Sequence, residues 1–337
     1  MNTSGAMNNL YLTAITHAGQ RLLSVGERGS IIYSDDNGKN WSASQTGLAD
    51  TLTDVSFFND SQGIAVGHGG NILKTNDAGS SWKRVLDGKE LIHLTTQAAK
   101  QVDDAKDPVQ QPSDLQARFE AYADRLQRNG SSEPLFSIRF LTESTAYAVG
   151  AYGMILKTED GGETWEVWMT HVDNPQELHL YAFMESEGIL YLAGEQGFLA
   201  KSTDQGEHFS RIETSAAGSF FTMAADKNGV VYAAGLQGQL IRSADHGQSW
   251  QAVKSDDTTS WIASQLDSQG NVVFGDMAGH LFKVNNASLV PIPTPSKSPL
   301  AGFVANGLGS LVLVGGAGIQ VISANSNSVL EVGHGTL

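Results

Sequence analysis

The chain repeats one short unit in which hydrophobic and polar positions alternate and glycine marks the turns. A first run such as LTDVSFF precedes an apolar run such as GIAVG, then a glycine turn, a third run such as NILKT, and a loop that leads to WKRV. Short alternating runs bounded by glycine predict β-strands, here four in each unit. A pair of glycines closes each turn between the second and third runs. Successive pairs begin 40 to 44 residues apart, apart from one interval of 83.

Seven copies of this unit predict seven blades, because four short strands in about 40–45 residues are typical of a propeller blade. One such meander cannot bury both of its faces, so the blades must stack into a ring. We predict an all-β, seven-bladed β-propeller of four-stranded antiparallel blades over residues 10–332, with tails at 1–9 and 333–337. The first strand of each unit is expected to lie innermost: Tyr11–Thr16, Leu52–Phe57, Leu135–Phe140, His179–Met184, Ser219–Ala224, Ser260–Gln265 and Leu300–Ala305. No strand exchange is evident, because blade 7 ends in its own outer strand at 329–332, and an added strand from residues 1–9 stays open as the alternative.

The doubled interval contains a helical insertion at residues 89–132, between blades 2 and 3, and not a further blade. Leu115, Phe119, Tyr122 and Leu126 fall at steps of four, three and four, which predicts an amphipathic helix between a cap at Ser113 and the glycine at position 130. A weaker helix is expected over 90–105. The connection places both beside the channel mouth, on the face of the glycine turns. They either brace the propeller or provide a lid or a surface for a partner.

The loop between the third and fourth strands carries the motif Ser/Thr-x-Asp-x-Gly-x-x-Trp. In blade 3 it reads Thr158, Asp160, Gly162 and Trp165. The hydroxyl and carboxylate can bond the amides of the loop, the glycine supplies positive φ, and the ring packs back on the hairpin. A metal loop of the EF-hand type needs further ligands that are missing. We therefore expect a structural role for the five aspartates: Asp36, Asp77, Asp160, Asp204 and Asp245.

Composition narrows the function classes. The 337 residues contain 36 acidic and 21 basic side chains, for a net charge of −15, so nucleic acid and anionic membrane are poor partners. There is no cysteine, which excludes disulfides, thiolate metal sites and a cysteine nucleophile. No apolar run is long enough to span a bilayer, and the N-terminus does not read as a signal peptide.

Candidate catalytic residues are few. The innermost strands supply one acid, Asp54, and one arginine, Arg139, whereas a sialidase needs an arginine cluster and a Tyr–Glu pair. A glycosidase needs two facing carboxylates, and only Glu195 or Asp276 on adjacent turns could join Asp54. We find no phosphate loop, GxSxG or HExxH motif. We therefore predict no catalytic residues, no cofactor and no metal. An Asp-box glycoside hydrolase and a propeller that binds a small molecule in its channel remain the alternatives.

The glycine turns place variable residues on a constant frame, as repeat proteins do when they display a recognition surface. Ordinary polar turns are the alternative. The rim candidates are Glu27, Arg28, His68, Tyr152, Glu195, Gln196, Gln237, Asp276 and Met277.

A second feature locked to the repeat is a cation near the end of the third strand. These side chains form either a basic stripe or salt bridges with neighbouring blades. They are Lys74, Lys157, Lys201, Arg242 and Lys283.

The Asp boxes and the blade pattern resemble the BNR and sialidase-like propellers. More narrowly, LTDVSFFNDSQGIAVGHGGNILKTNDAGSSW and FSIRFLTESTAYAVGAYGMILKTEDGGETW resemble the Ycf48/Hcf136 family, of the photosystem II assembly-factor type. The segments DNPQELHLYAF and YLAGEQGFLAK are similar to non-photosynthetic bacterial relatives, which tend to be exported and to accompany RND-type membrane transporters.

This resemblance implies a non-catalytic binding or assembly factor, monomeric, whose partner is a protein of a membrane complex. It implies export with the signal absent from this chain, and a cytoplasmic location stays open. Family members carry a positive patch for their client, and the net charge of −15 departs from that picture.

Overall fold

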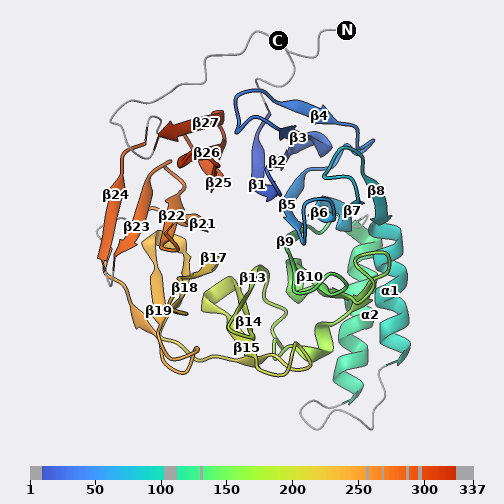
Figure 1. The fold of residues 1–337 in the computed structure, drawn as a ribbon. Helices are drawn as coiled ribbons and strands as arrows, with labels where there is room; N and C mark the ends of the chain where they lie inside the picture. The colour runs from blue at the N-terminus through green and yellow to red at the C-terminus, as the bar shows by residue number, and fades with distance from the viewer. Residues whose placement is uncertain are drawn as a thin grey trace.

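The structure, a computed structural model, describes residues 10–101, 112–129, 132–255, 258–267, 269–285, 288–294 and 298–323. Seven antiparallel sheets stand around a common axis, in chain order (Figure 1). The predicted seven-bladed propeller is confirmed. Six sheets have four strands each, and the described part of the seventh has three.

The strands follow the repeat closely. Blade 1 contains β1 (Leu12–Ala18), β2 (Arg21–Gly26), β3 (Ile31–Ser34) and β4 (Ser42–Ser44). Blade 2 contains β5 (Leu52–Phe57), β6 (Gly63–Gly67), β7 (Ile72–Thr75) and β8 (Lys83–Leu86). Blade 3 contains β9 (Leu135–Phe140), β10 (Ala146–Gly150), β11 (Ile155–Thr158) and β12 (Glu166–Val167). Blade 4 contains β13 (Leu180–Ser186), β14 (Ile189–Gly194), β15 (Leu199–Ser202) and β16 (Ser210–Arg211).

The C-terminal blades have the same order. Blade 5 contains β17 (Phe220–Ala225), β18 (Val231–Gly235), β19 (Leu240–Ser243) and β20 (Gln251–Ala252). Blade 6 contains β21 (Trp261–Leu266), β22 (Val272–Asp276), β23 (Leu281–Asn285) and β24 (Ser288–Ile292). Blade 7 contains β25 (Leu300–Ala305), β26 (Ser310–Gly315) and β27 (Gly318–Ser323). The expected innermost strands agree with β1, β5, β9, β13, β17, β21 and β25 to within two residues.

Hydrophobic clusters between neighbouring blades form the core. The ring closes by the same kind of packing, because Leu12 and Ile15 of blade 1 share a buried cluster with Val304, Val312 and Val314 of blade 7. Strands β1 and β25 lie against each other without exchange of a strand between the described sheets. The expected outer strand at 329–332 and both predicted tails lie outside the described residues.

The insertion forms two packed helices, α1 (Gly88–Gln101) and α2 (Pro112–Asn129). The chain around Val102, the side chain of Leu115 and the glycine at 130 lie outside the described part. Leu91, Tyr122 and Leu126 are buried in one cluster with blades 2 and 3, as a brace would be. Figure 1 shows both helices at the outer side of these blades, whereas we expected them beside the channel mouth. In this arrangement they do not cover the centre of the ring.

Candidate functional site

The candidate site lies on the face of the propeller that carries the glycine turns. The two glycines of each turn serve different purposes. In blade 4, a Cβ on Gly194 would lie 2.2 Å from the carbonyl oxygen of His179, so only glycine fits there. Gly197 has φ +75°, in the left-handed region that favours glycine. Between them, the Glu195 amide donates to the His179 carbonyl at 2.9 Å. The same bond to the residue before the innermost strand recurs in all seven blades, from the amides of Glu27, His68, Ala151, Glu195, Leu236, Met277 and Gly316.

Most predicted rim residues do lie on the surface of this face. Glu27, Arg28, His68, Gln196 and Gln237 are exposed, whereas Tyr152 and Glu195 are half-buried. Leu236 and Met277, the first residues of their turns, are exposed apolar side chains at 40% and 53%. The rim is therefore polar on blades 1 and 2 and more apolar on blades 5 and 6.

Asp276 departs from the expectation, because it is 0% exposed. It pairs with Trp261 across the sheet, as Gly194 pairs with Leu180, and so occupies the place of the first glycine. Its carboxylate turns inward, where it accepts the amides of Ala278 and His280 at 2.9 and 2.8 Å and contacts His280 Nδ1 at 2.8 Å. Asp276 builds the turn and is not available to a partner.

The innermost strands each carry a bulge, and the bulged residues form the wall of the channel near the turns. In blades 3, 4 and 5 these residues are aromatic: Phe136, Tyr181 and Phe221. The ring centroids of Phe136 and Tyr181 are 5.1 Å apart, and those of Tyr181 and Phe221 are 5.3 Å apart. We call these three side chains the aromatic arc. All are half-buried and line a cavity of about 200 Å³.

The opposite wall of the channel has a different character. The bulged residues there are the small Thr13, Thr53 and Ala301, and Ile262 of blade 6 lies between them and the aromatic side. The hydroxyl of Thr13 donates to the carbonyl of Leu52 at 2.6 Å, which ties blade 1 to blade 2. The wall with the small side chains thus helps to hold neighbouring blades together. The opposite wall presents its aromatic rings to the cavity.

Phe136, Tyr181 and Phe221 are not among the candidate site residues that the sequence predicts. The sequence carries a partial signal, because each bulged residue directly follows a large apolar residue repeated in every blade, but the bulge itself has no sequence mark. Those anchors are Leu12, Leu52, Leu135, Leu180, Phe220, Trp261 and Leu300.

His179 and Glu195 link the aromatic arc to the rim. The Tyr152 amide donates to His179 Nδ1 at 2.9 Å, and the two rings lie 4.7 Å apart. The His179 amide donates to Glu195 Oε2 at 3.2 Å, and the Nε2 of the same histidine lies 3.8 Å from that oxygen. Burial, and then the negative charge of Glu195, raises the pKa of Tyr181 above its ordinary value. The phenol therefore stays neutral beside a carboxylate.

Helix α2 reaches this site from outside. The guanidinium of Arg125 stacks 3.8 Å from the ring centroid of Tyr152 and lies 3.4 Å from a Glu177 carboxylate oxygen. Tyr122 donates to the Ala151 carbonyl at 3.2 Å, and burial raises its pKa well above the usual range. The insertion thus holds the glycine turn of blade 3 in place.

The two predicted channel residues bind each other. Arg139 donates to Asp54 Oδ2 at 2.6 Å, and the Ile138 amide donates to the same oxygen at 3.0 Å. The carboxylate of Asp54 thus has a salt bridge and a backbone bond across blades 2 and 3. This salt bridge joins the two blades. Asp276 is buried within its own turn and so does not serve as a second carboxylate opposite Asp54.

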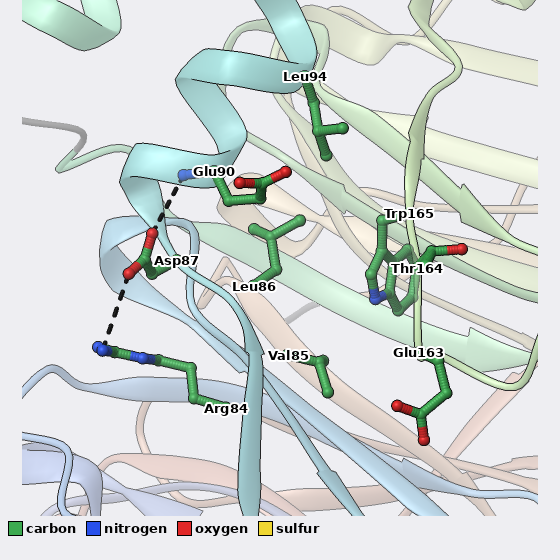
Figure 2. Close-up of a pocket in the computed structure, with 9 residues that line it drawn as sticks. All are labelled: Arg84, Val85, Leu86, Asp87, Glu90, Leu94, Glu163, Thr164 and Trp165. Carbon is green, nitrogen blue, oxygen red and sulfur yellow. Dashed lines mark hydrogen bonds and ion pairs between the residues drawn. The ribbon is translucent and has the colours of Figure 1, made fainter.

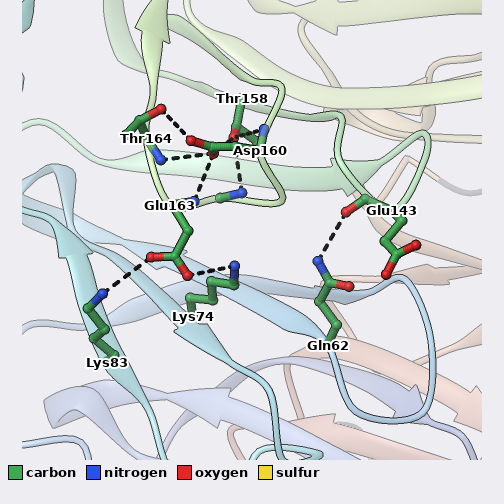
Figure 3. A network of polar contacts seen from close by, with 9 residues as sticks. Gln62, Lys74, Lys83, Glu143, Thr158, Asp160, Glu163 and Thr164 are labelled. Carbon is green, nitrogen blue, oxygen red and sulfur yellow. Dashed lines mark hydrogen bonds and ion pairs between the residues drawn. The ribbon is translucent and has the colours of Figure 1, made fainter.

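The Asp boxes use their aspartates within the loop. Asp160 accepts the amide of Thr164 at 2.9 Å and its hydroxyl at 2.6 Å, and Thr158 donates to it at 2.8 Å (Figure 3). The bonds outweigh the partial burial, which alone would raise the pKa, and lower the pKa of Asp160 to about 2. At Asp36, the Asn40 amide is the largest cause of a pKa of about 2.

The cations near the third-strand ends are used between blades rather than as a stripe. Lys74 lies 2.9 Å from Glu163 of blade 3. Lys157 lies 2.7 Å from Glu159 of its own blade and 3.6 Å from Glu207 of blade 4. Lys201 donates to the His246 carbonyl of blade 5 at 2.9 Å. In blade 6, Lys283 pairs with Asp267 at 2.7 Å and so stays within its own blade.

A larger cavity of about 540 Å³ lies between β8, α1 and the Asp box of blade 3 (Figure 2). Asp87 lies there between Arg84, at 3.7 Å, and the Glu90 amide, at 3.1 Å, so its carboxylate caps the start of α1. Trp165 on the far wall is 4% exposed and belongs to the blade 3 core. The wall residues thus join the insertion to the ring.

Neither a metal site nor a membrane span emerges from the described residues. They contain no group of three or more His, Asp or Glu side chains placed to hold a metal ion. Neither of the helices found in those ranges has the length and hydrophobicity to cross a bilayer.

Comparison with known families matches two parts of the chain. Residues 129–219 match the family described as photosynthesis system II assembly factor YCF48, and residues 32–43 match the BNR/Asp-box repeat. No curated protein sequence matches the chain.

Solved structures share the fold over nearly the whole chain. A structure of YCF48 bound to D1 peptide is 15% identical with a TM-score of 0.66, over 95% of both chains. YCF48 from Cyanidioschyzon merolae is 14% identical with a TM-score of 0.65, over 95% of this chain and 97% of that one. The WD40 propeller domain of Doa1 is 10% identical with a TM-score of 0.63, over 95% of both. At these identities the likeness establishes the fold alone.

Proposed function

We propose that this chain, a Ycf48-like BNR propeller, is a non-catalytic factor that binds a protein partner on the face of its glycine turns. The observation that carries the proposal is the aromatic arc of Phe136, Tyr181 and Phe221, half-exposed at the channel wall on this face. Aromatic side chains of this kind are enriched where proteins meet. The exposed Leu236 and Met277 extend the apolar surface outward over blades 5 and 6.

The arrangement of the acids supports binding over hydrolysis. Asp54 is held by Arg139 and a backbone amide, and Asp276 is buried within its turn. Glu195 accepts the amide of His179. A glycosidase would need two of these carboxylates to face a common space with a defined separation, and two of the three, Asp54 and Asp276, are instead engaged in the scaffold.

The similar YCF48 structure was solved with a D1 peptide, which supports a protein segment as the kind of ligand this fold receives. We extend the proposal to a partner from a membrane complex, to export of the chain and to action as a monomer. A link to an RND-type transporter is the narrowest form of the proposal, supported only by the sequence resemblance.

Site-specific photo-crosslinking tests the proposed face. Gln237 and Gln248 are both exposed glutamines of blade 5, the first in the glycine turn and the second in the Asp-box loop. A photoreactive residue at Gln237 should capture a discrete partner in cells that express the chain, and the same residue at Gln248 should not. Tyr181→Ala combined with Phe221→Ala should abolish the crosslink while circular dichroism confirms folding. Equal capture from both positions, or capture that survives the double substitution, would contradict the proposal.

A further inference from the structure

The aromatic arc lies beside a carboxylate, and that combination defines the chemistry of its ligand. Glu195 is at the turn of the same blade as Tyr181, where its Oε2 lies 3.8 Å from His179 Nε2, and the His179 ring centroid lies 6.0 Å from that of Tyr181. The three rings are inclined to one another, by 51° between Phe136 and Tyr181 and by 70° between Tyr181 and Phe221. They therefore curve around the wall and present several aromatic surfaces to the same space. Aromatic faces attract cations, and a carboxylate adds charge pairing.

The size of the cavity limits what can enter. Pockets for drug-sized ligands usually enclose about 300–1,000 Å³. The channel cavity holds about 200 Å³, which suits one long side chain better than a sugar chain or a cofactor. A side chain supplied by the bound partner would fill it and leave the partner's backbone on the rim.

The cations of this chain that lie near the mouth are already engaged. Arg139 pairs with Asp54 at 2.6 Å, and Arg125 pairs with Glu177 while it stacks on Tyr152 at 3.8 Å. The stack of Arg125 on Tyr152 is an internal example of the recognition we infer. At the arc itself, the His179 ring centroid lies 6.3 Å from that of Phe136 and 6.0 Å from that of Tyr181. The rest of the cavity wall includes Thr13, Thr53, Ile262 and Ala301 together with the paired Asp54 and Arg139.

We propose that the aromatic arc binds one cationic side chain, arginine or lysine, of the partner protein, with Glu195 as its counter-charge. This inference rests on the proposed function and adds the chemistry of the partner's anchoring residue. It differs from a basic patch that receives an acidic client, because here the cation belongs to the partner. The acidic character of the whole chain, −15, favours the approach of such a segment.

Fluorine NMR with small probes tests the chemistry directly. The chain would be labelled with 4-fluorophenylalanine, and the Phe136 and Phe221 signals would be assigned with Phe136→Leu and Phe221→Leu among the 13 phenylalanines. Nα-acetyl-arginine amide should shift both signals at millimolar concentration, and the neutral isostere Nα-acetyl-citrulline amide should not. Glu195→Gln should weaken arginine binding about 2- to 5-fold, the change expected for roughly 0.5–1 kcal/mol. The exposed Phe58 serves as the internal control, and its signal should not move.

The outcomes separate this inference from the proposed function. Equal shifts with the citrulline probe, or with Nα-acetyl-leucine amide, would show a general apolar site and overturn the inference, even if Gln237 still crosslinks to a partner. Failure of every probe to move Phe136 and Phe221 would overturn it in the same way. Failure of the otherwise unmodified chain to crosslink to a partner from position Gln237 would contradict the proposed function. Selective arginine shifts that decline in Glu195→Gln would support the inference.

Discussion

Lys74 of blade 2 places its ammonium 2.9 Å from a carboxylate oxygen of Glu163, a residue in the Asp-box loop of blade 3 (Figure 3). The lysine side chain is 8% exposed, whereas the glutamate is 46% exposed. Lys83 approaches the other oxygen of the same carboxylate at 3.2 Å. One acidic side chain thus serves as the common partner of two lysines and connects adjacent blades along the face opposite the glycine turns.

Glu163→Gln should lower the free energy of unfolding by about 1 kcal/mol at neutral pH, because it leaves the buried ammonium of Lys74 without its counter-charge. Urea denaturation followed by fluorescence measures the change. Lys83→Met is the matched control, since Lys83 is 74% exposed and its removal should alter stability by less than about 0.5 kcal/mol. An equal effect of both substitutions would contradict this account of the pair.

The Asp boxes make the free energy of unfolding depend on pH in the acid range. The Asn40 amide is the largest cause of the lowered pKa of Asp36, and the Ser202 hydroxyl has that role for Asp204; both pKa values are about 2. In the unfolded chain an aspartate titrates near 3.9. A lowered folded pKa means that the stabilisation is complete above the unfolded value and is lost as pH falls through about 2. The urea midpoint should therefore decline from pH 5 to pH 2.

The variant Asp36→Asn tests the assignment. It removes one titrating carboxylate and so should flatten the acid dependence of the midpoint, in addition to lowering stability at pH 7. Carbon-detected NMR of the carboxyl group in the unmodified protein should give a midpoint near 2. A midpoint near 4 would show that the hydrogen bonds of the loop do not act as described.

The repeat made the fold predictable, because glycine pairs and Asp boxes report local backbone demands that are the same in every blade. The aromatic arc was less accessible. A bulge in each innermost strand determines which residue faces the channel, and the sequence alone does not show the register shift that places Phe136 and Phe221 there.

Asp276 shows a related difficulty with register. In the sequence the glycines at 275 and 279 are one residue further apart than the glycine pairs of the other turns, which suggests a longer turn. The bond from the Met277 amide to the Ser260 carbonyl shows instead that Asp276 occupies the place of the first glycine and the turn has the usual length. The placement of the helices was also hard to predict, because a connection specifies a face of the propeller but not the distance from its axis.

In six blades the first glycine of the turn should be intolerant of a side chain for a reason of space, whereas Asp276 holds that place in blade 6. In Gly194→Ala, the new Cβ would be 2.2 Å from the His179 carbonyl oxygen, and the backbone must shift. We expect a loss of about 3 kcal/mol, at the upper end of the usual range for overpacking. Gly188→Ala is the control, because φ is +80° there but nothing lies within 4 Å, and it should cost about 1 kcal/mol. Thermal unfolding of the two variants distinguishes close approach from backbone conformation, and the reverse order of stability would contradict this explanation.

The insertion should stabilise the ring without taking part in the contact of the aromatic arc with a partner. Leu126 is 0% exposed in the cluster that joins α2 to blades 2 and 3, so Leu126→Ala should cost about 3 kcal/mol. Gln127→Ala on the exposed side of the same helix should change stability by less than about 0.5 kcal/mol. Since Leu126 is not among the residues that line the cavity with Phe136, Tyr181 and Phe221, Leu126→Ala should keep the crosslink from Gln237 at temperatures where it is folded. A variant that unfolds no more easily yet loses that crosslink would show that the insertion contributes to binding and is more than a brace.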